Sequence, residues 1–371
     1  MIRTLSAPAE AVCSKEYCNV AAQALGLDPV GHAREFDDAV VIETPLPWRR
    51  SMYEKAGALP QEVIDLMALW LERYQAGQPY NHCPLMVAPD PAYSQPGYRR
   101  VIFFSRRPGP ITHFDRAEYL VPEDEAGPLV WALYETQEEL DRFAPYLVPA
   151  APDGRQVRDL MICTHGSVDV VCGKFGYPLY RYLRDEYAND SLRVWRVSHF
   201  GGHVFAPTLL EMPTGHYWAY VGEAQAEQIA LRCGDVADLR GHYRGWAGVA
   251  DGFVQAAEWA AWQREGWAWF DYAKQGEVLV QDPTGEEPRW AKVQITYTRP
   301  DGTTGVFAAH VEITHMIETK PSTDQDRRYA YPQYTVTELW GAEPLAAEAA
   351  VDNGIVLLGE AAVTMKGEPS K

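Results

Sequence analysis

The sequence of 371 residues lacks several features that define large classes of protein. No stretch approaches the roughly 18 consecutive apolar residues that a membrane-spanning helix needs, so we expect no membrane partner. The first twenty residues lack the apolar segment of a secretory signal peptide, so we expect a cytoplasmic protein. Neither a G-x-G-x-x-G motif nor a P-loop is present, and the chain therefore shows no nucleotide-binding motif.

Positive charge and cysteine are also scarce. The chain has 33 Lys and Arg against 51 Asp and Glu, a formal net charge of −18. Such a balance disfavours binding to nucleic acid, which depends on cationic contacts. Six cysteines are too few for a disulfide scaffold, so free thiols in a reducing compartment are expected. These cysteines are Cys13, Cys18, Cys83, Cys163, Cys172 and Cys233.

The remaining composition is typical of a folded protein of mixed α/β class. Apolar residues make up 47% and charged residues 23% of the chain, which excludes a mostly disordered protein. Hydrophobic periodicity and turn residues predict both helices and strands. Helices are expected at 59–77, 136–144, 172–187, 223–233 and 249–274. Strands are expected at 39–45, 98–105, 157–163, 192–198, 208–212, 216–221, 277–281, 290–298, 305–317 and 328–340.

The loop at residues 147–155 contains two prolines and a glycine and predicts a domain boundary. We therefore expect a divergent N-terminal α/β domain over residues 1–150. A compact unit of strand, helix and strand follows over residues 151–235. Residues 236–371 are expected to form a helix and an antiparallel β-meander, since turn signals separate successive strands there.

The most informative segment combines two cysteines and two histidines. Cys163 and Cys172 form a C-x8-C motif, and His199 and His203 form an H-x3-H motif. Cys163 and His199 fall at the ends of predicted strands, and Cys172 falls at the start of a predicted helix. Neighbouring strands bring such ends together, so the four side chains are predicted to form one site.

Thiolates combined with imidazoles suit either zinc or an iron–sulfur cluster. Structural zinc sites usually take their cysteine pair from a tight C-x2–4-C turn, and the C-x8-C loop is too long for that turn. A longer loop can wrap a cluster, and in Rieske centres two histidines replace two cysteines on one iron. That division assigns Cys163 and Cys172 to one iron of a [2Fe–2S] cluster, and His199 and His203 to the other.

Several residues in the same loops are predicted to support this site. Glycine lets the backbone approach closely and offer N–H donors to sulfur. Asp169 is predicted to cap the helix that contains Cys172, and His165 is a candidate hydrogen-bond donor or proton relay. The supporting residues are Thr164, His165, Gly166, Asp169, Gly173, Gly201 and Gly202.

The runs CTHGSVDVVCGKFGYPLYRYLR and VWRVSHFGGHVFAPTLLEMPTGHYWAYV resemble the sucrase/ferredoxin-like family, whose motif is C-x8-C followed by H-x-G-G-H. The run CNVAAQALGLDPVGHAREFDDAVVIETPLPW is similar to the N-terminal domain of that family, so the resemblance covers roughly residues 18–235. It implies a thioredoxin-like ferredoxin domain that carries a [2Fe–2S] cluster on two Cys and two His. It also implies a role in redox homeostasis. Separately from the resemblance, the order of strand, helix and strand within residues 1–150 suggests that this domain is a second thioredoxin-like unit that has lost its ligands.

These observations predict an electron carrier rather than a stand-alone enzyme. An NAD(P)H-dependent reductase is the expected kind of redox partner, since the chain has no nucleotide motif of its own. No carboxylate pair points to sugar hydrolysis, so sucrase activity is not expected. Reduction is hypothesised to be coupled to protonation of His199 or His203. Two alternatives remain: a zinc-stabilised binding module without redox activity, and an oxidoreductase that uses Cys163 and Cys172 as a dithiol.

Overall fold

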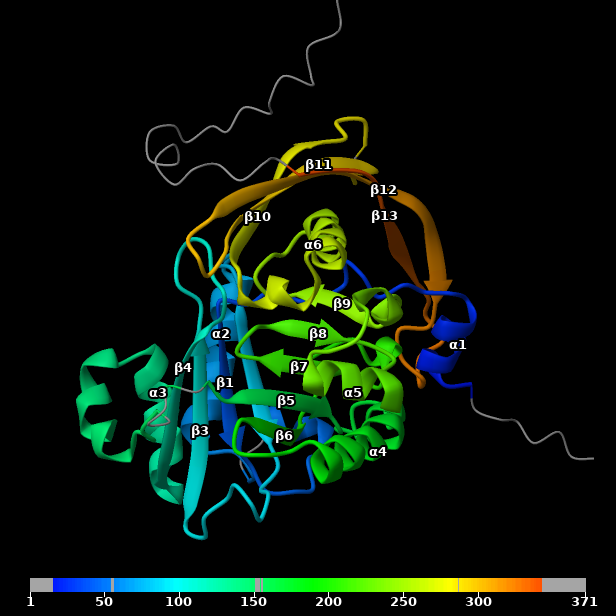
Figure 1. Ribbon diagram of the computed structural model, residues 1–371. Coiled ribbons are helices and arrows are strands. Elements are labelled where there is room, and N and C mark those ends of the chain that lie inside the picture. Colours follow the sequence, from blue (N-terminus) through cyan, green and yellow to red (C-terminus); the bar gives the residue numbers. More distant parts are fainter. Residues whose placement is uncertain (1–15, 55–56, 151–153, 155, 286, 342–371) are drawn as a thin grey trace, which may run out of the picture.

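A computed structural model describes residues 16–54, 57–150, 154, 156–285 and 287–341 (Figure 1). Helices and sheets alternate along the chain, which confirms the α/β class. Within the described part of the chain, no helix combines the length and apolar character needed to cross a membrane. The helices are α1 (Cys18–Ala24), α2 (Gln61–Gln75), α3 (Ala126–Tyr134), α4 (Val170–Glu186), α5 (Glu223–Leu231) and α6 (Gly252–Glu265).

A sheet of nine strands forms the centre of the molecule, in the order β4-β3-β1-β2-β6-β5-β7-β8-β9. Its strands are β1 (Asp38–Glu43), β2 (His82–Val87), β3 (Tyr98–Ser105), β4 (Asp115–Pro122), β5 (Arg158–Cys163), β6 (Leu192–Val197), β7 (Leu209–Met212), β8 (His216–Trp218) and β9 (Tyr243–Trp246). The predicted strands and helices of the central unit all occur, with ends shifted by a few residues.

The first eight strands form two units with the same topology. In each unit the first two strands are parallel, the third pairs antiparallel with the first, and the fourth pairs antiparallel with the third. The units meet edge to edge through β2 and β6, which share the single antiparallel pair Val87–Val197. One sheet thus crosses the predicted boundary near residue 150 and continues to β9 beyond residue 235. The domain limits and the thioredoxin-like assignment stay predictions.

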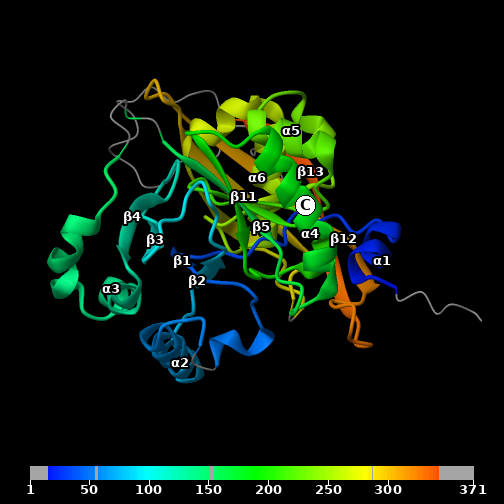
Figure 2. The same cartoon turned by 90° about the horizontal axis from the view of Figure 1, so that it is seen from below.

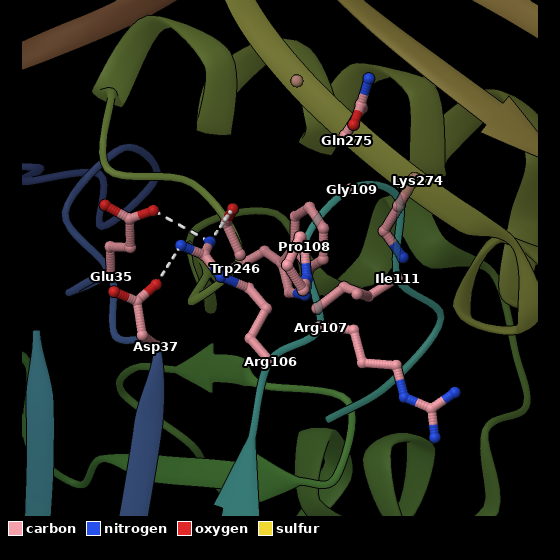
Figure 3. A pocket seen from close by; sticks show the side chains of 12 residues that line it. Glu35, Asp37, Arg106, Arg107, Pro108, Gly109, Ile111, Trp246, Lys274 and Gln275 are labelled. Carbon is pink, nitrogen blue, oxygen red and sulfur yellow. Dashed lines mark hydrogen bonds and ion pairs between the residues drawn. The ribbon is translucent and has the colours of Figure 1, made fainter. Parts of the chain in front are cut away.

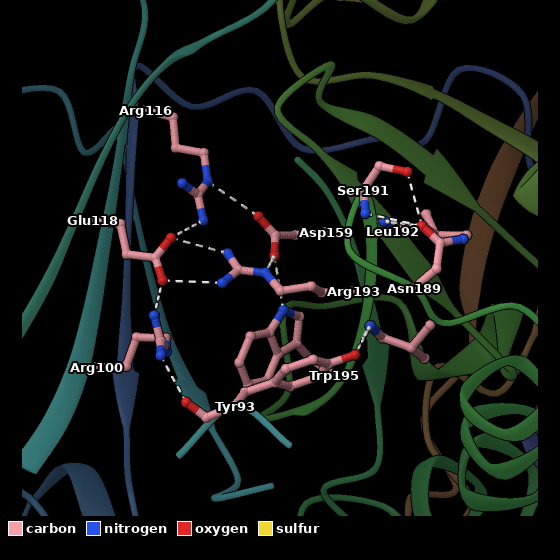
Figure 4. Close-up of polar contacts among 11 residues, drawn as sticks. Tyr93, Arg100, Arg116, Glu118, Asp159, Asn189, Ser191, Leu192, Arg193 and Trp195 are labelled. Carbon is pink, nitrogen blue, oxygen red and sulfur yellow. Dashed lines mark hydrogen bonds and ion pairs between the residues drawn. The ribbon is translucent and has the colours of Figure 1, made fainter. Parts of the chain in front are cut away.

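The sheet bends where the two units meet. In Figure 1, β1 and β3 run across the direction of β5–β9. A buried ionic network spans this corner (Figure 4). Arg193 on β6 donates to Glu118 on β4 and to Asp159 on β5, both at 2.9 Å. Arg116 and Arg100 also pair with Glu118. Since a buried carboxylate needs cationic partners, this network fixes the two units against each other.

A second sheet of four antiparallel strands arches over α6 (Figure 1). Its strands are β10 (Ala273–Gln281), β11 (Trp290–Thr298), β12 (Thr304–Thr319) and β13 (Tyr329–Gly341). Helix α6 lies between the two sheets, and Trp259 and Trp262 are buried there. The prediction of one helix over 249–274 is wrong. Gly266, at φ 69°, ends α6, because glycine tolerates this backbone region without a steric penalty.

Other local predictions also needed correction. Strands β2, β4 and β9 and helix α3 were not predicted. The segment expected to be a helix over 136–144 is a 3₁₀ helix over Gln137–Tyr146. The remaining 3₁₀ helices are η1 (Arg50–Tyr53), η2 (Glu123–Glu125), η4 (His203–Phe205), η5 (Val236–Leu239) and η6 (Gly266–Asp271). Helix α1 packs beside β12 and η4 (Figure 2), on the same side of the molecule as the histidine motif.

Candidate metal centre

Two neighbouring parallel strands carry the candidate ligands to one edge of the central sheet. Cys163 is the last residue of β5, and its register partner on β6 is Val197. His199 follows β6 by two residues, so it emerges at the same edge. Cys172 lies in the first turn of α4, the helix that connects these two strands. The βαβ connection therefore brings together residues that lie up to 36 positions apart.

The thiols of Cys163 and Cys172 and the imidazole of His199 form a compact group. Nδ1 of His199 lies 3.7 Å from the Sγ atom of each cysteine. All three potential ligand atoms lie within 4.8 Å of one another. Both cysteines are buried at 1% exposure, and His199 is half-buried. Among the described residues this is the only such group of three His, Cys, Asp or Glu side chains.

His203 lies beside this group without joining it. It is the first residue of η4, and its ring centroid lies 5.0 Å from that of His199. Nδ1 of His203 is buried and has no hydrogen-bond partner among the described residues. A buried polar atom without a partner is costly unless it binds something. The donor set therefore fits a metal group wider than one ion, although the assignment of the four residues as ligands stays a prediction.

The two buried thiols differ in acidity. Burial alone would raise the pKa of Cys163, but hydrogen bonds to Cys172 and His199 lower it well below the usual range of a thiol. The hydrogen bond to Cys163, together with burial, raises the pKa of Cys172 well above that range. The two thiols are thus coupled, and the first proton leaves Cys163 more readily than Cys172. Metal binding would release the second proton, since thiolates are the ligands.

Three glycines let α4 approach the cysteine loop. A Cβ atom on Gly173 would lie 3.2 Å from Cα of Gly166, so this predicted pair is a close backbone contact. Gly176, one turn further along α4, was not predicted. A Cβ atom there would lie 2.0 Å from the carbonyl oxygen of Cys163, a distance that no side chain tolerates. The G-x-x-G spacing on one helix face was the signal that could have found it.

Gly201 and Gly202 shape the turn between the two histidines. Both have positive φ, at 93° and 78°, which favours glycine. A Cβ atom on Gly202 would collide with the guanidinium of Arg244. Arg244 donates a hydrogen bond of 3.1 Å from Nη1 to the carbonyl oxygen of Gly201. The turn thus depends on a residue about forty positions downstream that sequence reasoning missed.

Asp169 is the N-cap of α4, as predicted, and it also holds a distant loop. Its Oδ1 accepts a hydrogen bond of 3.1 Å from the backbone N–H of Val171. Its carboxylate accepts further bonds of 2.7–2.8 Å from the hydroxyl of Ser322 and from the N–H and hydroxyl of Thr323. These residues lie in the loop between β12 and β13, which we call the strap loop (residues 320–328). The strap loop therefore closes over the site beside His203.

The N-terminal unit closes the opposite side. His165 is buried at 1% exposure, and Trp48 packs edge-on against its ring at a centroid distance of 5.8 Å. The backbone N–H of His199 donates to Nδ1 of His165 at 3.4 Å, so His165 orients the histidine segment. Burial lowers the pKa of His165, which favours the neutral imidazole. Thr164 is buried, and its backbone N–H donates a hydrogen bond of 3.0 Å to the carbonyl oxygen of Val197.

The remaining cysteines lie outside the group. Cys18 on α1 is buried, and burial raises its pKa to about 11. Its Sγ lies 3.8 Å from the carbonyl oxygen of His203, so α1 packs directly behind η4. Cys13 falls outside the described residues. Cys83 is buried and Cys233 is exposed, and neither belongs to the group of Cys163, Cys172 and His199.

Comparisons with known proteins agree with the sequence motif. A model of the sucrase/ferredoxin-like family matches residues 29–245, which include all four predicted ligands. The chain is also similar to "Altered inheritance of mitochondria protein 32" of Meyerozyma guilliermondii, with 26% identity over 145 residues. That alignment covers 36% of this chain and 50% of the relative, so the chain spans about half the length of the curated relative it matches. No solved structure matches.

Proposed function

The chain belongs to the sucrase/ferredoxin-like family, and from that premise we propose that it is an electron-transfer protein with a [2Fe–2S] cluster. Cys163, Cys172, His199 and His203 would hold the cluster, within a thioredoxin-like unit. The observation that carries the proposal is the convergence of two buried thiols on Nδ1 of His199, at 3.7 Å each. Nδ1 of His203, which is buried and has no hydrogen-bond partner among the described residues, would be the fourth donor atom.

A bound [2Fe–2S] cluster supplies one-electron transfer, and the chain sets the conditions for it. Neutral imidazoles bring less negative charge than thiolates, so two histidine ligands raise the potential relative to four cysteines. The thiols are buried, and the strap loop and Trp48 shield the site from water on opposite sides. The side chain of His203 is 19% exposed, so its ring can exchange a proton with solvent. Electron transfer is then coupled to protonation of a histidine.

Chemical analysis of the purified protein tests this proposal. The protein is purified without oxygen, and iron, acid-labile sulfide and zinc are measured alongside the visible spectrum. We expect a coloured protein with about two irons and two sulfides per chain. The colour should bleach on reduction and return on reoxidation. A colourless protein that contains about one zinc ion per chain would contradict the proposal.

A zinc-stabilised binding module is the second candidate, because one observation favours it. The donor atoms of Cys163, Cys172 and His199 lie within 4.8 Å of one another, which is compact enough for a single ion. The two candidates differ at His203, whose atoms lie outside that group. A zinc site built on three residues and water keeps its metal in the variant His203→Ala. A cluster that needs His203 is lost or becomes labile.

A dithiol oxidoreductase would use the same cysteines without a metal. Such an enzyme would retain thiol exchange activity in the variants His199→Ala and His203→Ala, whereas the cluster proposal predicts loss of visible absorption in both. His315→Ala is the matched control, because His315 is exposed on β12 and outside the group. Full thiol activity in metal-free protein would favour the dithiol reading.

The physiological setting is part of the proposal. We propose that an NAD(P)H-dependent reductase supplies the electrons and that the protein acts in redox homeostasis in a reducing compartment such as the cytoplasm. The name of the relative from Meyerozyma guilliermondii refers to mitochondrial inheritance, so mitochondria are the alternative compartment to examine. Fractionation of cells that express a tagged full-length chain distinguishes the two locations.

A further inference from the structure

A cavity of about 440 Å³ is lined in part by His199. Its polar wall includes Arg34, Arg244 and the backbone of Gly201, and its apolar wall includes Met67 and Phe200. The volume lies within the range of small-molecule sites, which combine an apolar surface with a few polar groups. The cavity is therefore large enough for a compact organic ligand next to a candidate metal ligand.

Arg244 is the unusual residue in this wall. It is only 6% exposed, and its guanidinium donates hydrogen bonds to two backbone carbonyls: Nε to His32 at 2.8 Å and Nη1 to Gly201 at 3.1 Å. Within the described part of the chain, no carboxylate forms an ion pair with it, and burial lowers its pKa to about 10. Buried arginines are almost always paired with an acid, because an isolated buried charge is costly. Arg244 thus has unused capacity to bind an anion.

A second cavity is lined by an arginine whose charge is neutralised by carboxylates of the chain, and it serves as a comparison for Arg244. That cavity, of about 460 Å³, is lined by Arg106 (Figure 3). Arg106 forms ion pairs with Glu35 and Asp37 and donates a further bond to the carbonyl oxygen of Gly248. Its charge is neutralised by the chain itself. The same neutralisation does not occur at Arg244.

Arg34 adds a second cation to the cavity beside His199. Its Nη2 donates to the carbonyl oxygen of His82 at 2.9 Å, and its guanidinium lies 5.2 Å from the centroid of the Tyr80 ring. No carboxylate among the described side chains forms an ion pair with Arg34 either. The cavity thus has two guanidinium groups that form no ion pair with a described carboxylate. Tyr80 and Phe200 line it as well, so the site combines a cationic region with an aromatic one.

We propose that this cavity binds a small aromatic carboxylate, with the carboxylate on Arg244 and Arg34 and the ring among the apolar side chains. Guanidinium groups match the planar geometry of a carboxylate and bind it through two hydrogen bonds. The bound ligand would lie against His199. The proposal depends on the geometry of the cavity and does not require the metal at the site to be iron.

Calorimetric titration of the full-length protein with 1-naphthoate tests this proposal, with 1-naphthamide as an uncharged control of similar size. We expect naphthoate to bind at least tenfold more tightly than naphthamide. The variants Arg34→Ala and Arg244→Lys should each weaken naphthoate binding at least tenfold and leave naphthamide binding unchanged. Arg107→Ala is the matched control, because the Arg107 side chain is 77% exposed and does not line this cavity.

The outcomes separate the two proposals. Absence of naphthoate binding at millimolar concentration, equal binding of both compounds, or binding that neither variant weakens would each overturn the anion site. Thermal unfolding checks that the variants are folded. If Arg244→Lys does not fold, the result for Arg34→Ala alone decides the test. Selective naphthoate binding by a protein without iron would support the anion site while contradicting the cluster.

Discussion

Replacing Gly176 with alanine would test how closely α4 must approach β5. The new Cβ atom would lie 2.0 Å from the carbonyl oxygen of Cys163, whereas real Cβ contacts are essentially never shorter than 3.0 Å. The helix or the strand must therefore move by about 1 Å. Overpacking of this kind costs about 1–3 kcal/mol, and the better helix propensity of alanine offsets about 1 kcal/mol of that. We expect a net loss of stability of up to about 2 kcal/mol.

The larger effect should be on metal binding, because the shift separates Cys172 from Cys163. Metal content per chain and urea unfolding are measured in parallel on Gly176→Ala and on Gly285→Ala. Gly285 is the matched control, since a Cβ atom there meets nothing closer than 3.5 Å. We expect wild-type values for the control and a clear loss of metal in Gly176→Ala. Wild-type metal content and stability in both variants would refute this account of the site.

Three further predictions concern charge and ligation. Asp169→Ala should lower the free energy of unfolding by about 3 kcal/mol, because it breaks a buried hydrogen-bond network. Asp169→Asn should lower it by less, because asparagine also caps helices. Urea unfolding measures both variants. The buried ion pairs with Arg158 and Arg232 overcome the opposing effect of burial and lower the pKa of Glu211 to about 2. The stability that this carboxylate contributes is present above its ordinary pKa of about 4.5 and is lost as the pH falls towards 2. The free energy of unfolding of Glu211→Gln should therefore depend less on pH than that of the wild-type protein, which urea unfolding between pH 5 and pH 3 measures. His203→Cys should retain a cluster with a lower reduction potential in a spectroscopic redox titration, and an unchanged or higher potential would argue against ligation by His203.

The sequence predicted the parts of the site that depend on local pattern. The alternation of strand, helix and strand around Cys163, Cys172 and His199 was visible because each element has its own periodicity and each ends at a recognisable turn. Strand β2 was missed because Pro84 interrupts it, and proline is normally excluded from central strands. The structure explains the exception: β6 joins β2 only at Val87, so most of β2 has a strand partner on one side alone.

The contacts that complete the site could not be predicted in this way. Thr323 lies 154 positions from Asp169, and Arg244 lies 43 positions from Gly201. No periodicity or motif links such residues. The Thr323 contact exists only once the second sheet has folded over α6, and the Arg244 contact exists only once β9 has joined the central sheet. Buried polar side chains at the end of a predicted strand or helix are the one local hint that a distant partner must exist.

The strap loop has a consequence for the order of events during synthesis. A ribosome makes about 5–20 residues per second, so Cys163, Cys172, His199 and His203 emerge on the order of ten seconds before Ser322 and Thr323. During that interval the nascent chain can already form the βαβ unit while the ligands remain uncovered. Under the proposed function, a metal would be able to enter from solvent or from a donor protein at this stage, before the last hairpin covers the side of the site beside His203.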